Sequence, residues 1–380
     1  MEYPPLLGGG GTYVKNLCDG LSSLGVELRL ITSGSVDGIE TVSKNLDVVR
    51  SANLLELYKE SGSFLSALDL LNQQIEDFKP DLVHTHHTVE KILFGVINVR
   101  HNLPFVATQT RTPGYSGYEK TYSSKQVRYE FSNRLNTDHY ICLSEVFMKD
   151  LLRCGVNKEI VSVIYPGVNN NDFFYIGKND VRLNKMKSRI GLNDGEVLIF
   201  IPTVIRQRKG VDFTLKAISN ISCGKKVKVV LSGLSAVEAN EELVMYYKGL
   251  TKPNILVEAG SLTVNDMNLM YNIADVVAFG SQGEGLGLVV LESMACQCPV
   301  VSTNVNGVNE ILVNGVNGLL CEYGDLDVFT KNLAGVLSSP ELRKKMIIGG
   351  RGTLESKFNT ALQAKKHFDI YTKVIENKKL

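Results

Sequence analysis

Residues 275–301, DVVAFGSQGEGLGLVVLESMACQCPVV, decide the fold class. The run at 275–281 has the apolar, Val-rich character of a strand buried on both faces. A glycine-rich loop follows, then the segment LVVLESMAC predicts a helix, and Pro299 opens a second apolar run. Strand, glycine loop, helix and strand in this order predict one βαβ unit of a parallel sheet.

The same alternation extends along the whole chain and predicts an α/β protein. Helical segments such as 12–25 and 63–78 separate the apolar runs and end at Gly25 and before Pro80. The polar stretch 169–185 is expected to be a linker, because 380 residues exceed one ordinary core. We therefore expect two Rossmann-type domains facing each other across a cleft that holds a ligand. The expected strands are 26–32, 81–86, 104–110, 139–144 and 161–167, then 196–205, 226–233, 254–260, 275–281, 299–305 and 317–323.

The charge and hydropathy of the chain exclude several classes of protein. A formal net charge of +1 argues against a nucleic-acid-binding protein, which usually carries a basic face. No apolar run reaches the roughly 18 residues of a membrane span, and the N-terminus lacks the features of a signal peptide. The 7 cysteines show no metal-ligand spacing, and Cys296 and Cys298 are expected to pack at a helix-to-strand turn. These features predict a cytoplasmic protein with reduced thiols.

Two carboxylates in the opening stretch, Glu284 and Glu292, need an explanation. Glycine loops let backbone amides approach a ligand closely, and a helix N-terminus favours an anion. Glu292 stands among apolar residues of the helix, so it needs a polar partner. A ribose diol can donate hydrogen bonds to it. The alternatives are that Glu284 is a solvated loop carboxylate and that Glu292 pairs with a buried Lys or Arg.

The spacing of these residues resembles a family signature. Ser281, the run 284–288, Glu292 and the run 299–301 resemble the Glu-x7-Glu motif of retaining glycosyltransferases of family 4. The resemblance implies the GT-B fold and a nucleotide-diphosphate sugar as donor. It also implies that Glu284 contacts the donor sugar and that Glu292 holds the ribose. The amides that would meet the sugar or diphosphate are those of Gly285, Leu286, Gly287 and Leu288.

A second matching segment, 199–218, contains a basic turn. The resemblance implies that Arg206, Arg208 and Lys209 place cations against the diphosphate, where charge-assisted hydrogen bonds are strong. Lys209 and the glycine after it match the family, whereas Thr203 and Val204 stand at its usual Gly and Arg positions, so we transfer the arginine role to Arg206. The alternative is a solvated basic turn.

The glycines at 8–11 resemble the N-terminal glycine loop of the family. The resemblance implies that the amides around Gly9 and Gly10 face the diphosphate and the acceptor; a flexible chain end is the alternative. An apolar strand normally precedes such a loop, yet none precedes it here. Either the chain begins late or the N-terminal sheet is incomplete, and we favour a late start.

Histidine is where the chain departs most from the family. Thr110 stands where family members often have a strand-end His, so that role does not transfer. His86 matches another position that is frequently His, although a strand-end His is often structural. His86, Thr110 and Arg111 are candidate contacts to the acceptor or the donor sugar. The segment 111–130, which begins with Arg111 and contains four tyrosines, is expected to line the acceptor site.

The resemblance implies a metal-independent retaining hexosyltransferase that uses no cofactor. No acid–base pair emerges from the sequence, which fits a reaction on one face of the sugar in which the leaving diphosphate takes the proton. The expected donor is a UDP- or GDP-linked sugar, and the acceptor is a hydroxyl of a glycan, a small molecule or a lipid-linked compound. Peripheral contact with the cytoplasmic membrane face stays open. The alternatives are a nucleotide-sugar epimerase of the same fold and a catalytically silent nucleotide-sugar-binding subunit.

The resemblance also gives domain boundaries. Residues 1–168 are expected to form the acceptor-binding domain, and residues 169–357 the donor-binding domain. The last segment, 358–380, has apolar residues at helical spacing. It is expected to form a helix that packs back on the first domain.

Overall fold

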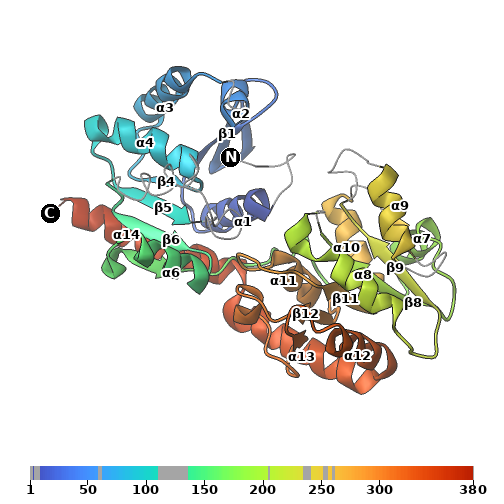
Figure 1. Ribbon diagram of the computed structural model, residues 1–380. Coiled ribbons are helices and arrows are strands. Elements are labelled where there is room, and N and C mark those ends of the chain that lie inside the picture. The colour runs from blue at the N-terminus through green and yellow to red at the C-terminus, as the bar shows by residue number, and fades with distance from the viewer. Residues whose placement is uncertain are drawn as a thin grey trace. The chain divides into compact units, whose positions relative to one another are not determined.

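The computed structural model describes residues 3, 9–58, 62–109, 136–203, 206–233, 241–250, 256–258 and 262–379. The chain divides into two compact units. The N-terminal unit consists of residues 1–167 and 359–380, and the C-terminal unit of residues 168–358 (Figure 1). The question of a strand before the glycine loop lies outside the described residues, because residues 4–8 are not among them.

The C-terminal unit is built on one six-stranded sheet in the order β10-β9-β8-β11-β12-β13. All neighbouring strands pair in parallel. Numbered along the chain from β8, the order is 3-2-1-4-5-6, which is the Rossmann order. Strands β8 to β10 are added toward one side of the sheet and β11 to β13 toward the other, so the order of addition reverses between β8 and β11. The strands are β8 (Val197–Ile201), β9 (Val227–Leu231), β10 (Leu256–Glu258), β11 (Val276–Phe279), β12 (Val300–Thr303) and β13 (Leu319–Cys321).

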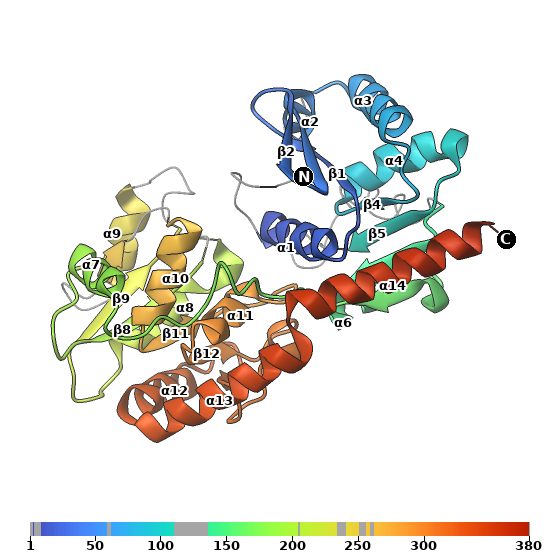
Figure 2. The same cartoon turned by 180° about the vertical axis from the view of Figure 1, so that it is seen from behind.

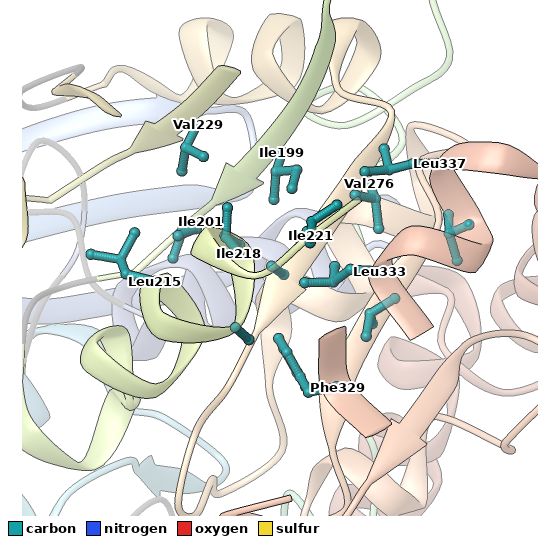
Figure 3. Packing of buried hydrophobic residues seen from close by; sticks show 14 of the residues in the cluster. Ile199, Ile201, Leu215, Ile218, Ile221, Val229, Val276, Phe329, Leu333 and Leu337 are labelled. Carbon is teal, nitrogen blue, oxygen red and sulfur yellow. The ribbon is translucent and has the colours of Figure 1, made fainter. Parts of the chain in front are cut away.

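Helices cover both faces of this sheet, which is why its central strands are apolar without alternation. Figure 3 shows one face, where β8 residues Ile199 and Ile201 pack against Leu215 of α8 and Phe329 of α12. On the other face, Phe200 of β8 meets the ring of Tyr271 from α10 at 5.3 Å between centroids. The helices are α7 (Val181–Arg189), α8 (Val211–Ser219), α9 (Glu241–Gly249), α10 (Val264–Ile273), α11 (Leu288–Ala295), α12 (Leu326–Ser338) and α13 (Pro340–Lys357), with 3-10 turns η3 (Gln207–Lys209) and η5 (Val308–Glu310).

Two predictions about this unit are wrong in their bounds. The expected linker 169–185 includes the start of α7, because the side chain of Asp180 accepts a hydrogen bond from the backbone N–H of Arg182 and caps that helix. The strand expected at 196–205 ends at Ile201, since Pro202 has no N–H for a ladder. Both corrections lie at element ends, where capping chemistry outweighs the apolar pattern.

The N-terminal unit contains two sheets. One is parallel with the order β4-β5-β6-β7, and the other has the order β1-β3-β2. The hairpin of β2 and β3 was not predicted, because every residue of β2 is exposed and its sequence GIETVS has no buried face. The strands are β1 (Leu28–Ser33), β2 (Gly38–Ser43), β3 (Leu46–Ser51), β4 (Val83–Thr85), β5 (Phe105–Gln109), β6 (His139–Cys142) and β7 (Val161–Val163).

The last helix, α14 (Thr360–Lys379), packs on α1 (Gly9–Ser23), as predicted (Figure 2). The helices approach so closely that a Cβ on Gly20 would lie 2.7 Å from the Cβ of Ala364. Gln363 accepts a hydrogen bond of 2.7 Å from the backbone N–H of Gly167, and Asn16 donates to the carbonyl of Gly167. The other elements are α2 (Ala52–Tyr58), α3 (Phe64–Phe78), α4 (Thr88–His101), α6 (Glu145–Arg153) and η2 (Lys158–Ile160).

A buried polar network joins α14 to α1 and to two strand ends. His367 Nε2 lies 2.9 Å from the hydroxyl of Tyr13, and His367 Nδ1 lies 2.8 Å from the carbonyl oxygen of Gln363. Because a carbonyl only accepts, Nδ1 carries the proton and Nε2 accepts from Tyr13. His84 bridges Thr108 of β5 and Tyr371 of α14, at 2.6 Å to each hydroxyl. In this arrangement His367 is neutral, with its proton on Nδ1.

Acidification is expected to weaken this network. Burial lowers the pKa of His367 to about 4, so as pH falls below about 6.5 the unfolded chain takes up the proton before the folded chain. Stability is thus undiminished above pH 7 and falls between about pH 6.5 and 4, by about 2 kcal/mol between pH 7 and pH 5 for this one group. Hydrogen exchange of α14 amides at both pH values should show that loss in the wild type and a smaller one in His367→Gln. Equal losses would contradict the assignment.

Candidate functional site

The two predicted motifs follow the carboxyl ends of β8 and β11. These neighbouring strands flank the reversal point of the sheet, where Rossmann-type sheets bind ligands. The basic turn η3 follows β8, and the glycine-rich loop 280–287 follows β11 and leads into α11. Both segments belong to the C-terminal unit, so the sheet itself brings them together.

Two glycines let the turn and the loop touch. Gly210 has φ +58°, and a Cβ there would lie 1.9 Å from the carbonyl oxygen of Gly280. A Cβ on Gly280 would lie 2.3 Å from Oγ1 of Thr214. At this approach the carbonyl of Arg208 accepts a hydrogen bond of 2.7 Å from the N–H of Gln282 and lies 3.0 Å from the hydroxyl oxygen of Ser281. The backbone contact therefore fixes η3 against the loop.

Glu284 is held by two cations and a hydroxyl. Lys209 Nζ and Ser281 Oγ each lie 2.7 Å from Glu284 Oε1, and Arg208 lies 3.5 Å from Oε2. The carboxylate side chain is only 7% exposed, so its charge is balanced inside the protein rather than by water. Burial lowers the pKa of Lys209, and the charge of Glu284 opposes that shift. The alternative of a solvated loop carboxylate is therefore excluded.

The loop before η5 supports Glu284 from the other side. Gly307 has φ +83°, and a Cβ there would lie 2.7 Å from the carbonyl oxygen of Glu284. The carbonyl of Asn306 accepts a hydrogen bond of 3.3 Å from the N–H of Glu284. Behind the loop, Gly287 serves as N-cap of α11 with φ +95° and offers no capping side chain. The N–H of Val290 donates to the carbonyl of Gly287 at 3.0 Å, and no side chain of Gly287 caps the other N–H groups at the start of α11.

Glu292 has a neutral partner instead of the cation considered in the alternative. The hydroxyl of Tyr271 in α10 donates to Glu292 Oε2 at 2.7 Å. Burial raises the pKa of Glu292 to about 7, the bond from Tyr271 lowers it, and the carboxylate of Asp172 raises it. The side chain is only partly buried, so it stays within reach of a ligand. Sequence analysis missed Tyr271, because nothing local links a helix residue to a carboxylate two elements later.

The predicted cations are placed differently from one another. Lys209 contacts Glu284, whereas Arg206 is exposed at the N-cap of η3. The arginine that the structure brings to Glu284 is Arg208, which also donates to the carbonyl of Gly283 at 3.0 Å. Thr203 is buried, and Val204 lies outside the described residues.

The predicted residues of the N-terminal unit form a second group around the start of α1. A Cβ on Gly10 would lie 3.3 Å from the ring of His87, and Gly9 is exposed. His86 is buried and lies edge-on to Tyr13, at 5.7 Å between ring centroids. Thr110 and Arg111 lie outside the described residues.

The described ranges contain no group of three or more His, Cys, Asp or Glu side chains placed to hold a metal ion. Within the same ranges, no helix combines the length and the apolar character needed to cross a bilayer. What the C-terminal unit does offer is cationic side chains, helix N–H groups and two carboxylates at one sheet edge. Such an arrangement can bind an anion and a polyhydroxyl compound together.

Known proteins match nearly the whole chain. Residues 7–172 match the family Glycosyltransferase Family 4, and residues 184–353 match Glycosyl transferases group 1. An uncharacterized glycosyltransferase of Methanocaldococcus jannaschii is 25% identical over 394 residues, which cover 99% of this chain and 97% of that protein.

Solved structures show the same fold. Sucrose-phosphate synthase from Thermosynechococcus elongatus has a TM-score of 0.81 at 19% identity, covering 97% of this chain and 94% of its own. HepE from Anabaena in complex with UDP-glucose has a TM-score of 0.77 at 16% identity, covering 98% of each chain. The expected GT-B fold class is thereby confirmed. With both family matches in their expected halves, this chain belongs to the GT-B glycosyltransferases of family 4.

Proposed function

We propose that the protein transfers a hexosyl group from a nucleotide-diphosphate sugar to a hydroxyl acceptor with retention of configuration. The observation that carries this proposal is the cluster of Lys209, Arg208 and Glu284 at the reversal point of the sheet. Glu292 with its tyrosine partner, also on the C-terminal unit, supplies an acceptor for the ribose hydroxyls. One unit thus offers groups for the sugar, the diphosphate and the ribose.

In the proposed reaction the bond between the anomeric carbon and the diphosphate oxygen breaks. The acceptor oxygen forms its bond to the same carbon on the same face, and the acceptor proton passes to the departing diphosphate. Lys209 and Arg208 stabilise the charge that develops on the leaving group, and the helix N–H groups of α11 add to it. On this scheme the side-chain cations do the work of a metal ion, and no cofactor takes part.

Glu284 has two tasks in this scheme. Before the donor binds, it neutralises Lys209 and Arg208, which would otherwise repel each other in a partly buried site. When the donor binds, Lys209 and Arg208 pair with its diphosphate, and the carboxylate of Glu284 accepts hydrogen bonds from hydroxyls of the donor sugar. The site is thereby kept ready for an anion without an unpaired buried charge.

UDP-sugars are the first donors to test, because HepE, which shares the fold, was solved with UDP-glucose. The panel consists of UDP-, GDP- and ADP-sugars, measured by thermal shift and by slow donor hydrolysis. Wild-type protein is expected to bind one donor class. A change of donor stereochemistry without acceptor would instead indicate an epimerase, and binding without any turnover against an acceptor pool would indicate a silent subunit.

The variant Glu292→Ala is expected to weaken donor binding by ~10- to 100-fold, because the ribose loses a charged acceptor and the hydroxyl of Tyr271 loses its partner. The matched control is Glu341→Ala, which removes an exposed carboxylate from the first turn of α13. Titration calorimetry with the donor found in the panel gives both affinities. Equal affinities in the two variants would remove Glu292 from the donor site.

A further inference from the structure

The two carboxylates of the site are held in opposite ways. Glu284 has two cations, whereas within the described residues Glu292 takes part in no ion pair and is held by the hydroxyl of Tyr271. When one oxygen of a carboxylate accepts a hydrogen bond from a fixed donor, the remaining lone pairs of that oxygen and the whole of the second oxygen can still accept from a ligand. The neutral hydroxyl of Tyr271 thus fixes Glu292 in place, as the cations fix Glu284. Because it carries no charge, it does not attract the diphosphate away from those cations.

Tyr271 itself is rigidly placed. Its side chain is 0% exposed, and its ring is packed edge-on between Phe200 at 5.3 Å and Phe173 at 5.9 Å between centroids. The ring therefore cannot turn away from Glu292 without disturbing the core.

The helix that carries Tyr271 is also fixed from outside. Asn268 accepts a hydrogen bond of 3.1 Å from the N–H of Phe174, and Asn272 accepts one of 2.6 Å from the N–H of Ile176. These two side chains stand on α10 on either side of Tyr271 and tie the segment after the unit boundary to the helix. The direction of the Tyr271 hydroxyl toward Glu292 is therefore fixed by the packing of its ring and by the hydrogen bonds that hold α10.

We propose that Tyr271 is a positioning residue that binds Oε2 of Glu292 and presents Oε1 to the ribose of the donor. This inference rests on the proposed function only for the identity of the ligand. The hydrogen bond and the ionisation of Glu292 are properties of the free protein. Tyr271 touches Glu292 and not the reacting atoms, so its effect is on donor binding rather than on the chemical step.

The groups that face Glu292 set the direction of the expected pH effect. They are Tyr271 from α10, Asp172 from the segment before α7, and Cys296 at the C-cap of α11. Tyr271 is the one that favours the ionised form, because burial and Asp172 both raise the pKa of Glu292. Removal of the hydroxyl in Tyr271→Phe is therefore expected to raise the titration midpoint of Glu292 from near pH 7 by about one unit.

The first experiment needs no ligand. Difference infrared spectroscopy follows the carboxyl band that titrates near pH 7 and that disappears in Glu292→Gln. In Tyr271→Phe the midpoint of this band should move up by about one pH unit. An unchanged midpoint would overturn the role of Tyr271, whether or not the protein uses a nucleotide sugar.

The second experiment uses the donor identified by the panel. Tyr271→Phe should raise KM for the donor about fivefold at pH 7 and leave kcat within about twofold, with a smaller effect at pH 9. The control is Tyr246→Phe, which removes a hydroxyl that donates to Asp212 at 2.6 Å on the surface of the same unit and should change neither constant. A fall in kcat with unchanged KM would overturn the positioning role.

A double variant separates positioning from general support of the fold. In a Glu292→Gln background the charge that Tyr271 stabilises is absent, so adding Tyr271→Phe should not shift the pH dependence of donor binding further. A further shift would show that Tyr271 acts by another route. If the wild type bound no donor at all, the proposed function would fail, while the infrared titration would still decide the role of Tyr271.

Discussion

Replacing Lys209 with alanine is expected to lower kcat by ~10²- to 10³-fold, a loss of about 3–4 kcal/mol of transition-state stabilisation. Its ammonium group lies 2.7 Å from Glu284, and its side chain is only 15% exposed, so the charge acts where water screens little. The variant also leaves Glu284 with Arg208 as its remaining cation at 3.5 Å. Steady-state kinetics with the identified donor gives kcat and KM separately.

Two further cation variants test how the loss arises. Lys216→Ala removes an exposed lysine of α8 and should leave kcat unchanged. Arg208→Ala should cost less than Lys209→Ala, because the side chain of Arg208 is 34% exposed and lies farther from the carboxylate. If Arg206→Ala lowered kcat more than Arg208→Ala, the arginine role would return to the position that the family resemblance implied.

Gly210→Ala is expected to destabilise the C-terminal unit by about 4 kcal/mol. Two effects combine at this residue: its φ of +58° is unfavourable for alanine, and the new Cβ would lie 1.9 Å from the carbonyl oxygen of Gly280. That contact is with backbone, which cannot move aside as a flexible side chain can. The turn and the loop must separate, so donor binding should fall with stability.

Gly191→Ala is the matched control, because Gly191 has a similar φ of +64° but its Cβ would meet only the end of Lys228 at 3.7 Å. It isolates the conformational cost, about 1 kcal/mol. Chemical unfolding of both variants measures the difference, and thermal shift with the donor shows whether binding is lost only in Gly210→Ala. Equal losses of stability would mean that the approach of Gly210 to Gly280 contributes nothing.

Much of the fold could be predicted from local sequence, because buried parallel strands are continuous apolar runs between helical segments. β11 and β12 were found this way, as was α14 from its apolar spacing. The hairpin of β2 and β3 could not be found, since β2 is exposed and is stabilised by pairing with β3 rather than by burial of its own side chains. The end of β8 and the start of α7 were set by Pro202 and by the cap of Asp180.

The candidate site also has features that local sequence predicts and features that depend on tertiary contacts. The two carboxylates, the lysine and the glycines could be identified from the sequence, because they stand in two short motifs at recognisable spacing. Tertiary structure alone decided their partners. The choice of Arg208 depends on the approach of Gly210 to Gly280, 70 residues apart along the chain, and Glu292 meets a tyrosine on another helix.

The polar network of the N-terminal unit shows the physical reason most directly. Tyr13 and His367 are 354 residues apart and meet because α14 packs on α1. A local pattern specifies the conformation and the buried face of each helix. Which buried polar atoms find each other depends on how those faces pack, and packing is a property of the folded chain as a whole.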